Sequence, residues 1–165
     1  MGKFEMQLPK EILKDFERIH GNVDKIFEGM TRAGAEVVYN NVLTNLPPEL
    51  KGSEFKKCIG ITKSYKTPSD DGINTKVIIN GYFTTKRNES GTASKGAVFK
   101  SNVVVPAPLV ANAFEYGTTE RYTMGGAYRG KISKKPFFRK SFKKAQIETA
   151  MLEAQKKLSG GLLNE

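Results

Sequence analysis

The first third of the chain has the apolar spacing of a helix. The positions in residues 22–46 that share one face are Val23, Ile26, Phe27, Met30, Gly34, Val37, Val38, Asn41 and Val42. Gly34 lies on this stripe at a cost of ~1 kcal/mol in helix propensity, so we expect another backbone to approach closely there. Residues 9–20 predict a separate, shorter helix, because Gly21 interrupts the pattern. Pro47-Pro48 ends the long helix.

Alternating apolar and polar positions follow the proline pair. Residues 53–66 predict a turn or short helix that runs into a strand, and residues 75–83 predict a second strand. The intervening residues 68–72 have turn chemistry, so the two strands are expected to form a hairpin. Residues 103–105 are three valines and predict a strand that returns to the sheet.

Two long polar segments separate the later elements. Residues 84–102 and 117–135 are rich in Gly, Ser or Thr and in basic residues, and loops of this length are usually functional or disordered. A helix opens at Pro106, between the two loops. A last helix is expected to begin at Pro136 and to stop at Ser159, which leaves residues 159–165 as a flexible tail.

These elements predict an α+β fold. We expect a small, mainly antiparallel sheet packed against the helix of residues 22–46 and the C-terminal helix, with two long loops. A chain of 165 residues is long enough to bury a real core, and we expect a single domain over residues 1–165.

Charge adds a preference for anionic partners. The net charge is +10; residues 1–50 carry six basic and eight acidic side chains, whereas residues 51–165 carry 21 basic and nine acidic ones. Such a field favours nucleic acid or an acidic protein face, although a solvated basic surface is the alternative reading for any single lysine.

The densest basic run lies in residues 131–144. It holds seven positive charges and no acid: Lys131, Lys134, Lys135, Arg139, Lys140, Lys143 and Lys144. Several are expected in the first turns of the last helix, where the helix dipole disfavours cations, so stability does not explain them. Phe138 and Phe142 are expected to pack inward, whereas Phe137 covers the sheet edge or anchors a subunit contact.

Residues with catalytic or metal-binding chemistry are isolated in this sequence. The only histidine, His20, lies at an expected helix end without a visible partner, and the only cysteine, Cys58, is expected to be a small buried side chain. Asp70-Asp71 lacks a third ligand, and Gly125–Gly130 lacks the features of a phosphate loop. We therefore predict no enzymatic activity and assign no catalytic, metal-binding or cofactor-binding residue.

No apolar run approaches the ~20 residues that cross a bilayer. Residues 1–6 have no apolar core of signal-peptide length. We therefore expect no membrane partner and the cytoplasm as the default compartment.

Two short motifs, taken in order, carry a resemblance. Phe114-Glu115-Tyr116-Gly117-Thr118 closes one predicted helix, and after a loop Lys135-Pro136-Phe137-Phe138-Arg139-Lys140-Ser141-Phe142 leads into the terminal helix. With the order of elements from about residue 9 to residue 158, they resemble the head–tail connector or tail-completion (neck) proteins of long-tailed bacteriophages.

The resemblance implies a non-enzymatic structural subunit without cofactors. Such a subunit forms a ring, usually a hexamer, that caps the tail tube and joins it to the head around the DNA channel. The implied partners are sister copies, head-completion or connector proteins, the tail tube protein and, transiently and non-specifically, DNA. The implied location is the head–tail junction of the virion, after assembly in the host cytoplasm. The loop at residues 84–102 is longer than the family leads us to expect.

By analogy, Glu115, Tyr116 and Gly117 would support the turn into the second loop, and Pro136–Arg139 would fix the last helix on the sheet. Our candidates for subunit or partner contact are Glu115, Tyr116, Gly117, Arg121, Lys134, Lys135, Phe137, Arg139 and Lys143. Our candidates for lumen or loop contacts are Lys86, Arg87, Lys95 and Lys100.

Two other functions remain open from the residues alone. One is a monomeric module of phage origin that binds nucleic acid non-specifically, which rests on the basic C-terminal region. The other is a small phage enzyme such as a nuclease, which would need a cluster of carboxylates or histidines.

Overall fold

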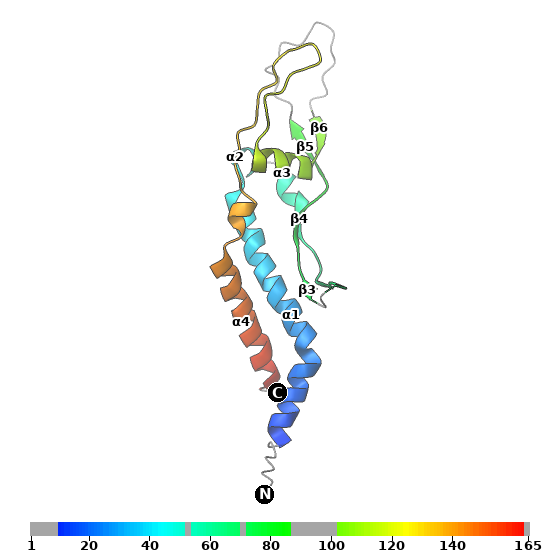
Figure 1. Ribbon diagram of the computed structural model, residues 1–165, viewed down its shortest axis with the longest axis vertical. Helices are drawn as coiled ribbons and strands as arrows, with labels where there is room; N and C mark the ends of the chain where they lie inside the picture. Colours follow the sequence, from blue (N-terminus) through cyan, green and yellow to red (C-terminus); the bar gives the residue numbers. More distant parts are fainter. Residues whose placement is uncertain (1–9, 52–53, 70–71, 87–101, 164–165) are drawn as a thin grey trace, which may run out of the picture. The chain divides into compact units, whose positions relative to one another are not determined.

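The computed structural model describes residues 10–51, 54–69, 72–86 and 102–163 (Figure 1). Helices dominate and the strands pair in antiparallel ladders, so the predicted α+β class is confirmed. The chain divides into two compact units, each assembled from separate stretches of sequence. Unit 1 comprises Met1–Val37, Lys63–Lys76 and Lys144–Glu165, and unit 2 comprises Val38–Thr62 and Val77–Lys143.

Helix α1 runs without a break from Lys10 to Asn45, and its first part, up to Val37, belongs to unit 1. The separate helices predicted on either side of Gly21 are therefore wrong. One exposed glycine costs a helix ~1 kcal/mol, which is too little to end a hydrogen-bond ladder that continues in both directions. Asn22 caps no helix here, because its Nδ2 donates to the Arg18 carbonyl one turn earlier, at 2.9 Å.

Helix α4, Lys144–Leu163, packs against the glycine positions of α1 in unit 1. A Cβ placed on Gly34 would lie 3.1 Å from Met151 Cγ and 3.2 Å from Ile147 Cγ2. A Cβ on Gly29 would collide with Leu158 Cδ1. The close approach expected at Gly34 is therefore made by the side chains of α4.

Both predicted ends of the last helix are wrong. The helix starts at Lys144 instead of Pro136, because Phe142 has a ψ of 79° and turns the chain out of the helical conformation. The helix also continues through Gly160 and Gly161 to Leu163, so most of the tail predicted at residues 159–165 is helical. Two glycines lower helix propensity, but a glycine ends a helix only where its backbone turns left-handed.

The remaining part of unit 1 is a small ladder held on α1. Strands β2 (Tyr65–Lys66) and β3 (Ile73–Asn74) pair antiparallel. The Thr75 hydroxyl donates to the Thr31 hydroxyl of α1 at 3.0 Å, and Lys66 forms an ion pair with Asp24 at 2.8 Å.

Unit 2 contains the other two ladders. Strand β1 (Ile59–Ile61) pairs antiparallel with β4 (Val77–Ile79), with Ile59 opposite Ile79, so the predicted antiparallel hairpin pairing is confirmed. The predicted strand of residues 75–83 is broken, because Gly81 has a φ of 87°. The chain then forms β5 (Tyr82–Lys86), which pairs with β6 (Asn102–Pro106) and confirms the predicted returning strand.

Short helices complete unit 2. They are α2 (Pro48–Lys51), the 3-10 turns η1 (Glu54–Cys58) and η2 (Arg139–Ser141), and α3 (Ala107–Tyr116). Helix α3 ends at Gly117, which has a φ of 80°, at the start of the predicted second loop. In the described part of the chain, no helix has the length and apolar character needed to cross a bilayer.

The core of unit 2 is centred on Phe55, which is fully buried. Its ring meets the edge of Phe83 at a centroid distance of 5.3 Å and that of Phe137 at 6.4 Å. Phe137 is only 1% exposed, so the interpretation of this residue as an anchor for a subunit contact is wrong. Burying its ring inside the unit removes the apolar area that an interface would need.

Candidate functional site: a carboxylate-held turn and a basic hairpin

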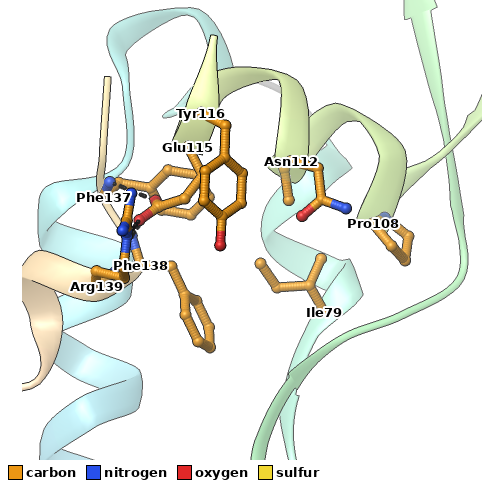
Figure 2. Close-up of a pocket in the computed structure, with 9 residues that line it drawn as sticks. Ile79, Pro108, Asn112, Glu115, Tyr116, Phe137, Phe138 and Arg139 are labelled. Atoms are coloured by element: carbon orange, nitrogen blue, oxygen red, sulfur yellow. Dashed lines mark hydrogen bonds and ion pairs between the residues drawn. The ribbon is translucent and has the colours of Figure 1, made fainter. Parts of the chain in front are cut away.

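Glu115 joins the two sequence motifs. It lies in the last turn of α3 with a side chain that is 6% exposed. Its carboxylate accepts hydrogen bonds from the backbone N–H groups of Phe137 and Phe138, both at 2.9 Å. It also accepts from the N–H of Arg139 at 3.2 Å and from Arg139 Nε at 3.0 Å (Figure 2).

The backbone at the start of η2 explains why a carboxylate is placed there. The first N–H groups of a helical turn have no partner within the turn, and an anion is their strongest acceptor. The other side of the turn is bound by α1, because Asn41 Nδ2 donates to the Ser141 carbonyl at 3.1 Å and Asn45 Nδ2 to Ser141 Oγ at 3.0 Å. The turn is thus fixed from two helices.

The same contacts set the charge state of Glu115. Burial acts to raise its pKa, but the hydrogen bonds from Phe138, Arg139 and Phe137 together outweigh burial and lower the pKa below its ordinary value. Glu115 is therefore ionised at neutral pH, with both oxygens engaged. Through these four hydrogen bonds the carboxylate holds the backbone of the turn at residues 137–139.

A pocket of about 220 Å³ lies beside this carboxylate. Its lining residues are Ile79, Pro108, Ala111, Asn112, Glu115, Tyr116, Phe137, Phe138 and Arg139. The Arg139 guanidinium lies 4.8 Å from the centroid of the Tyr116 ring, and Figure 2 shows the Tyr116 hydroxyl directed towards the space between Phe138 and Ile79. The pocket is smaller than typical ligand sites, and its walls contain no histidine, no thiol and no free carboxylate.

The predicted loop at residues 117–135 is an ordered hairpin. Residues 118–132, which we call the basic hairpin, leave the end of α3 and return beside it (yellow in Figure 1). Thr118 N–H donates to the Ile132 carbonyl at 2.9 Å near the base, and Thr123 N–H donates to the Ala127 carbonyl at 2.8 Å near the tip. The sequence signal that could have found it is a pair of tyrosines flanking a Gly-Gly turn, which indicates a hairpin.

Large side chains on the basic hairpin face solvent. Tyr122 and Tyr128 form a bridge pair, and their rings lie 5.5 Å apart although each is more than half exposed. Met124 at the tip is fully exposed, and Arg121 and Arg129 are exposed as well. The hairpin thus combines exposed aromatic and cationic groups on an ordered backbone.

Two of the predicted interface residues are internal instead. Glu115 and Phe137 are buried in unit 2, so neither offers a surface to a partner. Gly117 is half-buried against the hairpin base, where a Cβ would lie 3.2 Å from the Ile132 carbonyl oxygen. The two motifs therefore contribute to the internal structure of unit 2, and the hydrogen bonds of Glu115 hold one motif against the other.

The other interface candidates are at least partly accessible. Tyr116, Arg121, Lys134, Arg139 and Lys143 are exposed, and half-buried Lys135 forms an ion pair with Glu49. Hydrogen bonding to Lys135 lowers the pKa of Glu49.

The basic run of residues 131–144 is mostly outside the last helix. Lys144 alone lies within α4, where it pairs with Glu148 at 3.6 Å, so the expected placement of several of these cations in its first turns is wrong. Four exposed lysines of the run have no ion pair among the described residues: Lys131, Lys134, Lys140 and Lys143. Lys86 ends β5, and Arg87, Lys95 and Lys100 lie outside the described residues.

Positive and negative charges are distributed unevenly between the two units. Unit 1 contains twelve basic and twelve acidic residues, whereas unit 2 contains fifteen basic and five acidic ones. The entire net charge of +10 therefore belongs to unit 2.

The isolated reactive residues have ordinary surroundings. Cys58 is half-buried rather than buried; its Sγ donates to the Tyr82 carbonyl at 3.5 Å, and burial raises the pKa of its thiol. His20 is exposed within α1 and does not lie at a helix end. Over the described ranges, no group of three or more His, Cys, Asp or Glu residues could hold a metal ion, and Asp70-Asp71 falls outside them.

Comparison of the chain with protein-family models, curated proteins and solved structures finds no match. The resemblance to phage neck proteins therefore stays a prediction from the two motifs and the order of elements along the sequence.

Proposed function

We propose that this chain is a ring-forming tail-completion or neck subunit of a bacteriophage. It caps the tail tube and joins it to the head connector around the DNA channel. The observation that carries the proposal is the concentration of all net charge in unit 2, whereas unit 1 has a net charge of zero.

A ring around DNA needs this division of charge. Identical subunits that each present a cationic face repel one another unless an anion lies between them or a neutral part supplies the contacts. Unit 2 provides exposed cations with no acidic partner among the described residues, including Lys131, Lys134, Lys140 and Lys143. Unit 1, with balanced charge, suits contacts between like copies.

The Glu115 contact supports the same proposal. Binding elements are most effective when a rigid scaffold holds them in place. The turn fixed by Glu115 lies at the base of the basic hairpin, where Lys135 N–H donates to the Phe114 carbonyl at 2.7 Å. A subunit built in this way keeps the hairpin in one position while partners assemble around it.

A monomeric, non-specific nucleic-acid-binding module is the second candidate. The observation that favours it is the basic hairpin, whose exposed tyrosines and arginines are typical of nucleic-acid surfaces. The two proposals differ in oligomeric state. A module binds DNA as a monomer with strong salt dependence, whereas a neck subunit forms rings with tail components.

Electron microscopy of phage particles produced with and without this protein tests the proposal. We expect unjoined heads and tails in its absence, and restored joining when the intact chain is supplied in trans. Complete infectious particles that lack the protein would contradict the proposal.

A further inference from the structure

We propose that Arg121 and Arg129 of the basic hairpin form a binding site for the phosphate backbone of duplex DNA. This inference rests on the proposed function and deepens it, because a ring of this kind encloses DNA. It assigns DNA contact to the hairpin instead of the loop at residues 84–102.

The hairpin register places the two arginines opposite each other. Arg129 N–H donates to the Arg121 carbonyl at 2.6 Å, and Arg121 N–H donates to the Gly130 carbonyl at 3.1 Å. Two residues, Arg129 and Gly130, thus oppose Arg121, which is the pattern of a β-bulge. Gly130 has a φ of 79°, a conformation that glycine adopts without strain.

The aromatic pair next to the arginines shows that the two arms of the hairpin lie in register. Tyr122 and Tyr128 form an antiparallel bridge, and their rings are 5.5 Å apart. Arg121 and Arg129, each next to one of these tyrosines, lie across from each other on the two arms, and both are exposed.

The hairpin leaves the repulsion between the arginines uncompensated. Like charges directly opposite each other destabilise an antiparallel pair. The neighbouring acid, Glu120, accepts a hydrogen bond from the Tyr122 hydroxyl at 2.9 Å. Arg121 donates through Nε to the Gly130 carbonyl at 3.4 Å, and Arg129 has no ion pair among the described residues. An anion between the two guanidinium groups would remove this repulsion.

Phosphate backbone suits this arrangement better than an acidic protein. Guanidinium groups bind phosphate oxygens through paired hydrogen bonds. A two-stranded ribbon is narrow enough to follow a groove of duplex DNA. The surrounding unit carries a large positive excess, which favours a continuous polyanion over an isolated carboxylate.

The test measures the affinity of the full chain for a labelled short DNA duplex by fluorescence anisotropy at several salt concentrations. For R121Q/R129Q we expect the affinity to fall about ten-fold at about 0.1 M salt. The salt slope is the slope of the logarithm of the binding constant against the logarithm of the salt concentration. Its magnitude should fall by about 1.8, because each phosphate that the protein no longer neutralises lowers it by about 0.9.

A matched control removes the same charge elsewhere. K156Q/K157Q replaces two exposed lysines in α4 of unit 1. We expect that control to keep the wild-type slope, since these lysines lie outside the proposed site.

A second variant of the same two positions distinguishes loss of the site from misfolding of the chain. R121K/R129K keeps the charge and removes the planar guanidinium geometry, so it should keep the salt slope while binding more weakly. The proposed site would be wrong if R121Q/R129Q and K156Q/K157Q weakened DNA binding equally. It would also be wrong if R121Q/R129Q bound DNA as tightly as the wild type. Competition by polyglutamate as effective as that by duplex DNA would overturn it as well, because the surface would then suit an acidic protein.

These outcomes are separate from those of the proposed function. Unchanged DNA binding by R121Q/R129Q, with particles that still need the protein for joining, refutes the site alone. Weakened binding by R121Q/R129Q, with normal particles in the absence of the protein, refutes the neck assignment and leaves the site intact.

Discussion

Replacement of Glu115 by glutamine tests whether one buried carboxylate holds the turn at residues 137–139. The carboxylate accepts three backbone hydrogen bonds and one from Arg139 Nε. In E115Q one oxygen remains as an acceptor, and the new NH₂ group faces N–H donors that it cannot bind. The substitution therefore removes acceptors without changing the size of the side chain.

The size of the effect follows from the number of hydrogen bonds removed. About two hydrogen bonds to a charged acceptor disappear, at about 1.5–3 kcal/mol each, and part of this stabilisation is recovered by relaxation. Arg139 is 56% exposed, so its ion pair adds little. We expect E115Q to lower the unfolding free energy by about 3 kcal/mol, which lowers Tm by about 6–12 °C in a chain of this length.

Scanning calorimetry at neutral pH measures the destabilisation, with E120Q as the matched control. Glu120 is exposed in the same unit and accepts a hydrogen bond from the Tyr122 hydroxyl. E120Q should remain within about 0.5 kcal/mol of the wild type. An E115Q chain as stable as E120Q would show that the Glu115 carboxylate does not hold this turn.

The pH dependence supplies an independent check with a fixed sign. The pKa of Glu115 is lower in the folded chain than its ordinary value. The stabilisation is therefore complete above the unfolded pKa, about 4.3, and disappears as pH falls through the lower folded pKa. The stability difference between wild type and E115Q should shrink on acidification, and a difference that grows would contradict the assignment.

Other substitutions test the remaining packing by chemical denaturation. G117A should cost about 1–2 kcal/mol, because a Cβ there meets the Ile132 carbonyl oxygen at a φ of 80°. G125A should be nearly neutral, because a Cβ there makes only an ordinary contact, 3.8 Å from Thr123 Oγ1. F137A should cost about 3–5 kcal/mol because the ring is buried, whereas F142A, at a 53% exposed position, should cost much less. G21A should stabilise α1 by about 0.5–1 kcal/mol, since nothing lies within 4 Å of a Cβ there, and a decrease in stability would show that the helix is not continuous.

Local signals predict most elements of the fold. The apolar stripe of residues 22–46, the Pro47-Pro48 stop and the helix that ends at Gly117 all depend on neighbours within a few residues, and the structure has each of them. The errors at Gly21 and at Ser159–Gly161 have one physical cause. Glycine is a stop signal only when the backbone turns left-handed there, and the sequence does not show whether it does.

The candidate site depends on contacts that local patterns do not contain. Glu115 and its backbone donors are separated by 22–24 residues, and nothing in the spacing of the two motifs shows that a carboxylate reaches across. Phe137 has the sequence surroundings of a surface anchor, because cations flank it, yet it packs against Phe55, which lies far away along the chain. Burial is set by the tertiary fold, so composition indicates the basic surface but not the core beneath it.

Cryo-EM of the neck of intact virions shows directly where this chain lies. We expect a closed ring of this chain between head and tail tube, with unit 2 and the basic hairpin of residues 118–132 lining the DNA channel. A neck without this chain, or a ring whose unit 2 faces outward while neutral unit 1 lines the channel, would contradict it.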